Sequence, residues 1–142
     1  MNSSMPTGHR PQSSHAGAIA QLKGYRVLVV EDDYFVAQDL CSTLRTRGAT
    51  VIGPARSVDV ARQLVSSQMV DCALLDINLH GEYAFDFAEE LQRSGIRTVF
   101  TTGYDTSFIP PRLRHTACLQ KPVDTNALLQ SIRVRSPGAA RP

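Results

Sequence analysis

Short apolar runs alternate along the chain with segments in which apolar residues recur every three or four positions. The runs are rich in β-branched residues and are too short for helices, which predicts strands buried on both faces. These strands are predicted at Tyr25–Val30, Thr50–Pro54, Ala73–Ile77, Thr98–Thr101 and Ala117–Gln120.

Amphipathic helices are predicted after most of these strands, because the spacing of apolar residues matches one face of a helix. Proline breaks helical hydrogen bonding, so Pro110-Pro111 leaves room only for a short or broken helix before the last strand. The predicted inward faces are Val36, Leu40 and Leu44, ending near Gly48; Val60, Leu64 and Val65, capped by Ser57; Phe85, Ala88 and Leu91, ending at Ser94-Gly95; and Leu128, Leu129 and Ile132, within Asn126–Val134.

This alternation predicts an α/β fold, a doubly wound parallel sheet with helices on both faces and right-handed crossovers. In such sheets the functional site lies beyond the carboxyl ends of the strands. Residues 1–23 and 136–142 are rich in small and polar residues and are predicted to be flexible tails. The chain of 142 residues therefore holds one domain.

Composition argues against several classes of function. The formal net charge is only +2 and no basic stripe is present, so we expect no nucleic-acid partner. No apolar run reaches the ~18 residues of a membrane span, and the N-terminus lacks the apolar core of a signal peptide. The cysteines Cys41, Cys72 and Cys118 are widely spaced, which favours free thiols in a soluble, cytoplasmic protein.

Acidic residues follow two of the buried strands. Glu31, Asp32 and Asp33 come directly after the first strand, and Asp76 lies within the apolar run of the third. A helix N-cap explains one of them, most naturally Asp33. It does not explain Asp76, because an acid is rarely buried without a partner. Two like charges ~4 Å apart repel by roughly 4 kcal/mol at an effective dielectric near 20, so the site must protonate or hold a cation, for which Mg²⁺ is suited.

Two further polar groups are expected at the same edge of the sheet. Thr102 follows the fourth strand, and Lys121, one of only two lysines, follows the fifth. A carboxylate with a metal ion, a hydroxyl and an ammonium group around it describes a phosphoryl-transfer site. Asp76 is then the nucleophile that forms an aspartyl-phosphate.

Four motifs, VLVVEDD, LLDINLHGE, VFTTGYD and LQKPVD, resemble in order and spacing the signature regions of bacterial two-component response-regulator receiver domains of the chemotaxis-regulator-like type. The similarity covers residues 24–135, predicted to be the receiver domain. FTTGY resembles a stand-alone, single-domain subgroup with a Phe-Ala-Thr-Gly-Tyr-like motif. The resemblance implies a flavodoxin-like, five-stranded sheet in the order 2-1-3-4-5.

The resemblance also implies how the acids divide the metal site. Asp32 corresponds to a direct Mg²⁺ ligand and Glu31 to one that acts mainly through water. Asp76 and the backbone carbonyl of Asn78 correspond to the remaining protein ligands. The cofactor implied is Mg²⁺.

Three residues correspond to the family's phosphoryl-transfer groups. Asp76 matches the phosphoacceptor, Thr102 the switch hydroxyl and Lys121 the phosphate-binding lysine, whose bond to Pro122 is implied to be cis. The family's aromatic switch position is Cys118 here, which departs from the pattern; Tyr104 is a candidate substitute.

The function implied is that of a single-domain response regulator, which accepts a phosphoryl group on Asp76 from a phosphohistidine. The partner is a sensor histidine kinase or a histidine phosphotransfer protein, and the downstream target is a protein that the sequence does not identify. Signalling is by phosphorylation-dependent protein interaction, as a relay, a sink or a kinase regulator, with the protein a monomer or weak dimer and not an enzyme acting on external substrates. The alternatives are a small aspartate-nucleophile phosphatase and a receiver-like binding module that is not phosphorylated.

Overall fold

The structure is a computed structural model that describes residues 20–103 and 106–133. Tyr104, residues 1–19 and residues 134–142 lie outside this range, and with them most of both predicted tails and the end of the predicted last helix at Val134. In the described residues no helix is both long enough and apolar enough to cross a membrane.

A five-stranded parallel sheet forms the centre of the protein, in the order β2-β1-β3-β6-β7. Every predicted strand is present, within two residues of its expected bounds. Counted along the chain without the small hairpin described below, this order is 2-1-3-4-5, so the predicted doubly wound, flavodoxin-like fold is confirmed. The strands are β1 (Arg26–Val30), β2 (Thr50–Ala55), β3 (Cys72–Asp76), β6 (Arg97–Thr102) and β7 (Ala117–Gln120).

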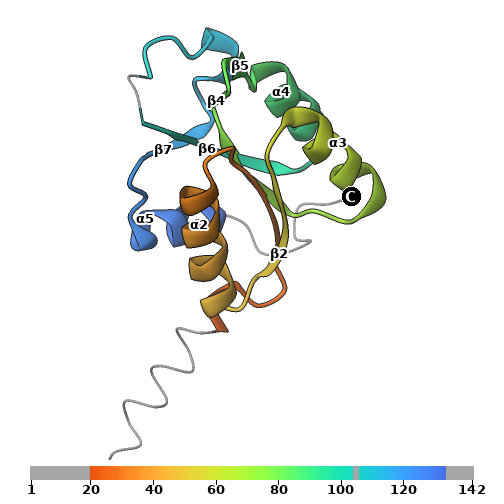
Figure 1. The fold of residues 1–142 in the computed structure, drawn as a ribbon, viewed down its shortest axis with the longest axis vertical. Coiled ribbons are helices and arrows are strands. Elements are labelled where there is room, and N and C mark those ends of the chain that lie inside the picture. The colour runs from red at the N-terminus through yellow and green to blue at the C-terminus, as the bar shows by residue number, and fades with distance from the viewer. Residues whose placement is uncertain (1–19, 104–105, 134–142) are drawn as a thin grey trace, which may run out of the picture.

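Helices cover both faces of this sheet (Figure 1): α2 and α5 lie on one side, and α3 and α4 lie on the other. Each of the two layers buries its own cluster of apolar side chains against the strands. The predicted inward residues of α5, Leu128, Leu129 and Ile132, are all buried. The helices are α2 (Tyr34–Thr46), α3 (Val58–Ser67), α4 (Phe85–Arg93) and α5 (Thr125–Ile132).

The helix ends follow the capping signals in the sequence. Asp33 caps α2 by accepting hydrogen bonds from the backbone N–H groups of Phe35 and Val36, at 2.9 and 3.1 Å. Ser57 caps α3 through the N–H of Val60 at 3.2 Å, as predicted. The inward placement of Val60 is wrong, however, because that residue is 43% exposed. The buried face of α3 runs through Val58 and Ala61 instead, and Val60 lies one residue, or about 100° of rotation, away from Ala61.

Between β6 and β7 the described residues form a single 3₁₀ turn, η2 (Pro111–Leu113), which confirms the short or broken helix expected there. Pro111 occupies the first position of that turn, where a missing N–H costs nothing. The bond between Lys121 and Pro122 is cis, as the resemblance implied, and so is the bond between Gly53 and Pro54.

Two elements were not predicted. The 3₁₀ turn η1 (Ala20–Leu22) lies in the stretch expected to be a tail, yet Leu22 is fully buried and donates a backbone hydrogen bond to the carbonyl of Arg47 at 2.8 Å. The folded unit therefore includes residues before Gly24. The second element is a hairpin formed by β4 (Asn78–Leu79) and β5 (Glu82–Tyr83), directly after β3. It returns the chain to the edge of the sheet at which Asp76 lies.

Candidate functional site

Three acidic side chains converge at the carboxyl ends of β1 and β3. These strands are neighbours in the sheet, with Val30 opposite Leu75. Glu31 and Asp32 follow Val30 directly, and Asp76 ends β3, so parallel pairing brings all three to one edge. Carboxylate oxygens of Glu31, Asp32 and Asp76 lie within 4.8 Å of one another. The structure thus brings together the three acids that the sequence singled out.

Lys121 lies opposite these acids, at the end of β7. Its Nζ is 2.8 Å from Oε1 of Glu31 and 3.2 Å from Oδ2 of Asp76. The pairing of β6 with β7 positions this lysine, since its backbone N–H donates to the carbonyl of Thr102 at 2.8 Å. Burial on its own would lower the pKa of Lys121, but the contacts with the two carboxylates outweigh it and raise that pKa.

Burial dominates the electrostatics of the acids. The Glu31 side chain is only 1% exposed, and desolvation raises its pKa from 4.5 to about 7 although Lys121 and the N–H of Asp33 favour the charged form. Desolvation also raises the pKa of Asp76, against the lowering effect of Lys121. One ammonium group therefore does not compensate both carboxylates.

A divalent cation fits this donor set. Oε1 of Glu31 is buried and, within the described part of the chain, has no partner in hydrogen-bonding geometry despite its close contact with Lys121. The available donors are carboxylate oxygens, the ligands that Mg²⁺ prefers. An all-oxygen set with an unsatisfied buried oxygen and excess negative charge fits Mg²⁺ better than a soft or nitrogen-seeking metal.

A cavity of about 450 Å³ opens over the acids. It is lined by Glu31, Asp32, Asp33, Val36, Asp76, Asn78, His80, Gly103 and Lys121. Asn78 lies beside Asp76, where its backbone N–H is 3.4 Å from the Asp76 carboxylate. Thr102 ends β6 at the same edge, but its side chain is buried and is not among the described residues that line this cavity.

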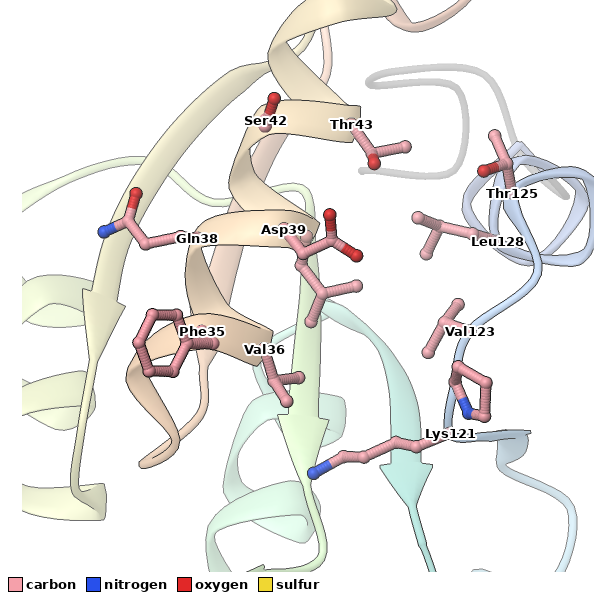
Figure 2. Close-up of a pocket in the computed structure, with 12 residues that line it drawn as sticks. Phe35, Val36, Gln38, Asp39, Ser42, Thr43, Lys121, Val123, Thr125 and Leu128 are labelled. Atoms are coloured by element: carbon pink, nitrogen blue, oxygen red, sulfur yellow. The ribbon is translucent and has the colours of Figure 1, made fainter.

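A larger groove of about 610 Å³ lies beside the cavity, between α2 and the segment that joins β7 to α5. Figure 2 shows Val36 and Asp39 of α2 facing Val123 and Leu128, with Lys121 at one end and Phe35 on the other side of the helix; all of these residues line the groove. Val36 and Lys121 line both the groove and the cavity over the acids. Phe35 is 79% exposed, which is unusual for so large an apolar side chain.

His80 is a site residue whose contact the sequence did not predict. Its side chain is mostly exposed, but Nδ1 lies 3.2 Å from Oδ2 of Asp32. The sequence offers no signal for this contact, because the two residues are 48 positions apart and meet only through the hairpin.

Comparison with known proteins agrees with this geometry. The family model of the response regulator receiver domain matches residues 27–133. The chain belongs to the receiver-domain family. The solution structure of SdrG from Sphingomonas melonis Fr1 is similar to this receiver domain, with 31% sequence identity and a TM-score of 0.69 over 80% of this chain and 98% of that one.

Curated relatives are similar over shorter shares of their own length. The sensory transduction protein LytT of Bacillus subtilis (strain 168) is 30% identical over 115 residues, which make up 76% of this chain and 46% of LytT. The uncharacterised transcriptional regulatory protein YbdJ of the same organism is 32% identical over 75 residues, 53% of this chain and 32% of YbdJ. The receiver domain thus spans less than half the length of these two relatives.

Proposed function

We propose that this receiver domain accepts a phosphoryl group on Asp76 from a phosphohistidine and signals through the state of that residue. The observation that carries the proposal is the contact of one ammonium group, Lys121, with two buried acids whose oxygens also lie close to Asp32. This is a charge arrangement suited to a phosphoryl group that brings negative charge and a cation that balances it.

In the proposed step an oxygen of the Asp76 carboxylate attacks the phosphorus in line with the phosphohistidine nitrogen. The P–N bond breaks, the P–O bond forms, and the imidazole of the partner leaves with the electron pair. Lys121 lies 3.2 Å from Oδ2 of Asp76 and neutralises charge on the transferred group. A bound Mg²⁺, held by Asp32, Asp76 and the carbonyl of Asn78, with Glu31 acting through water, would supply further charge neutralisation.

After transfer, Thr102 and Lys121 are the groups we expect to hold the phosphoryl oxygens. Their backbones are joined by the hydrogen bond from Lys121 N–H to Thr102 C=O. A movement of one strand end therefore displaces the other. Attack of water on the acyl phosphate returns Asp76 to its free state. The domain then acts by a shift between two conformations that bind partners differently, as a relay, a sink or a kinase regulator.

The groove between α2 and the β7–α5 segment is where we place the phosphodonor, a sensor histidine kinase or a histidine phosphotransfer protein. It shares Val36 and Lys121 with the cavity over the acids, so a helix lying in it would bring a side chain close to Asp76. Its exposed apolar residue, Phe35, suits an amphipathic partner helix. We expect this exchange to take place in the cytoplasm.

A phosphatase that uses Asp76 as its nucleophile is less well supported. Enzymes of that kind carry a second acid two residues after the nucleophile as a general acid, whereas this position is Asn78. A receiver-like module that is not phosphorylated would not need Lys121 beside the two acids or the cavity above them.

The test is incubation with acetyl phosphate and Mg²⁺ followed by intact-mass measurement. We expect a gain of one phosphoryl group in the wild-type protein. This gain should be absent when EDTA is present during the incubation, and absent in Asp76→Asn. Asp59→Asn is the matched control, because Asp59 is almost fully exposed at the start of α3 and away from the site. No gain in the wild-type protein, or an equal gain in Asp76→Asn, would contradict the proposal.

A further inference from the structure

The turn of the β4–β5 hairpin has an unusual backbone. His80 and Gly81 form its two central positions, with φ angles of 50° and 85°. Two positive φ angles in succession are typical of a type I′ turn, in which asparagine and glycine are favoured. His80 is the one residue other than glycine with a positive φ in the described part of the chain. Such conformations persist where surrounding contacts enforce them, and they concentrate at functional sites.

The contacts that hold His80 come from Asp32. The backbone N–H of His80 donates to Oδ2 of Asp32 at 2.9 Å, and Nδ1 of the imidazole lies 3.2 Å from the same oxygen. The other end of the turn is fixed by the side chain of Asn78, whose Oδ1 accepts from the N–H of Gly81 at 2.7 Å. The hairpin is therefore anchored to Asp32 of the acidic site, and its turn is fixed from within by Asn78.

The two partners differ in their surroundings. The Asp32 side chain is only 15% exposed, while that of His80 is 71% exposed and lines the cavity over the acids. An imidazole in contact with one oxygen of a carboxylate restricts the orientation of that carboxylate and leaves its second oxygen available. Groups that contact a metal ligand in this way orient it and tune the affinity of the site.

We propose that His80 is a positioning residue for Asp32. The imidazole of His80 holds the Asp32 carboxylate in the orientation that binds the cation. This inference rests on the proposed function, because it assigns Asp32 to the cation of that site. The strained turn and the two-point contact are independent observations that lead to the same residue. His80 does not contact the reacting atoms; it acts through Asp32.

Two substitutions at this position separate the imidazole from the turn. Glycine and asparagine both accept a positive φ, so His80→Gly and His80→Asn preserve the hairpin. The Asn side chain carries a nitrogen bonded to Cγ, as Nδ1 is in histidine, and can donate to Asp32 from nearly the same place. Glycine has no such donor. Both variants keep the backbone hydrogen bond to Asp32.

The measurement is the dissociation constant for Mg²⁺ of the unphosphorylated protein, determined by calorimetric titration at the same pH for wild type and both variants. We expect Mg²⁺ binding about tenfold weaker in His80→Gly and within about twofold of wild type in His80→Asn. Urea denaturation in EDTA should show both variants at least as stable as wild type, because each relieves the strained turn, so weaker binding cannot be attributed to unfolding.

Equal or tighter Mg²⁺ binding by His80→Gly would overturn the proposal, and tighter binding would mean that the imidazole competes with the cation. Equal weakening in both variants would also overturn it, since the donor would then not matter. Phosphorylation by acetyl phosphate at saturating Mg²⁺ distinguishes a failure of the role assigned to His80 from a failure of the proposed function. If wild type is modified on Asp76 and the affinities do not differ, only the role of His80 fails; if wild type is not modified, the proposed function fails as well.

Discussion

Replacing Glu31 by glutamine should stabilise the metal-free protein at alkaline pH and leave it little changed in acid. The Glu31 side chain is 1% exposed, its Oε2 accepts from the N–H of Asp33 at 3.0 Å, and its Oε1 lies 2.8 Å from Nζ of Lys121. These contacts favour the carboxylate, but burial outweighs them and raises the pKa of Glu31 to about 7. The folded state therefore prefers this group protonated.

The magnitude follows from the difference between the two states. A pKa of about 7 in the folded protein, against the ordinary value of 4.5, corresponds to about 3 kcal/mol. Because the folded pKa is the higher one, the contribution to stability is complete below about pH 4.5 and is lost as the pH rises through about 7. Glutamine stays neutral throughout, so the variant and wild type should diverge over this range, with the variant more stable by up to about 3 kcal/mol at about pH 8.

Urea denaturation in EDTA at several pH values measures this difference in unfolding free energy. The comparison requires that the slope of the unfolding free energy with urea concentration is the same in both proteins. Mg²⁺ added at about pH 8 should stabilise wild type more than Glu31→Gln, because wild type offers three carboxylates and the variant two. Asp59→Asn, which removes an exposed charge, should show neither effect. A stability difference that does not change with pH, or a variant less stable than wild type at about pH 8 without metal, would refute the reasoning.

Three other substitutions test separate parts of the structure. Lys121→Met should destabilise the metal-free protein by about 1–3 kcal/mol at neutral pH, because it leaves Glu31 and Asp76 without their shared ammonium group, and Mg²⁺ should restore part of the loss in a denaturation experiment. Phe35→Ala should leave modification by acetyl phosphate unchanged but slow transfer from a phosphohistidine protein. Equal transfer rates in the variant and wild type would contradict binding of the phosphodonor in the groove. Leu22→Ala should cost about 2–4 kcal/mol of unfolding free energy, since Leu22 is fully buried, whereas a loss near zero would place the start of the folded unit later in the chain.

Much of the fold could be predicted because its signals are local. Strands buried on both faces appear as short β-branched runs, and N-cap residues such as Asp33 and Ser57 indicate where the following helices begin. The error at Val60 has the same local origin. Its spacing from Leu64 suits a helical stripe, but the buried face of α3 runs through Val58 and Ala61, and Val60 is one residue, or about 100° of rotation, away from Ala61.

The sequence predicted that the acids of the candidate site would meet, but not every contact around them. Parallel pairing brings the ends of β1 and β3 together, so the meeting of Asp32 with Asp76 followed from topology. The sequence does not predict the burial of Leu22, because that leucine ends a stretch of small residues and belongs to no periodic apolar pattern. The contact between His80 and Asp32 depends on a hairpin of two-residue strands, too short for an alternating pattern to be recognised.

The central claim is that Asp76 is the residue that takes up a phosphoryl group beside a bound cation. Its most direct test is to phosphorylate the protein with acetyl phosphate and Mg²⁺, reduce the acyl phosphate with borohydride, and map the modified residue by peptide mass spectrometry. The account predicts conversion of Asp76, and of no other acid, to homoserine. Conversion at Glu31 or Asp32, or no conversion with Mg²⁺ present, would contradict it.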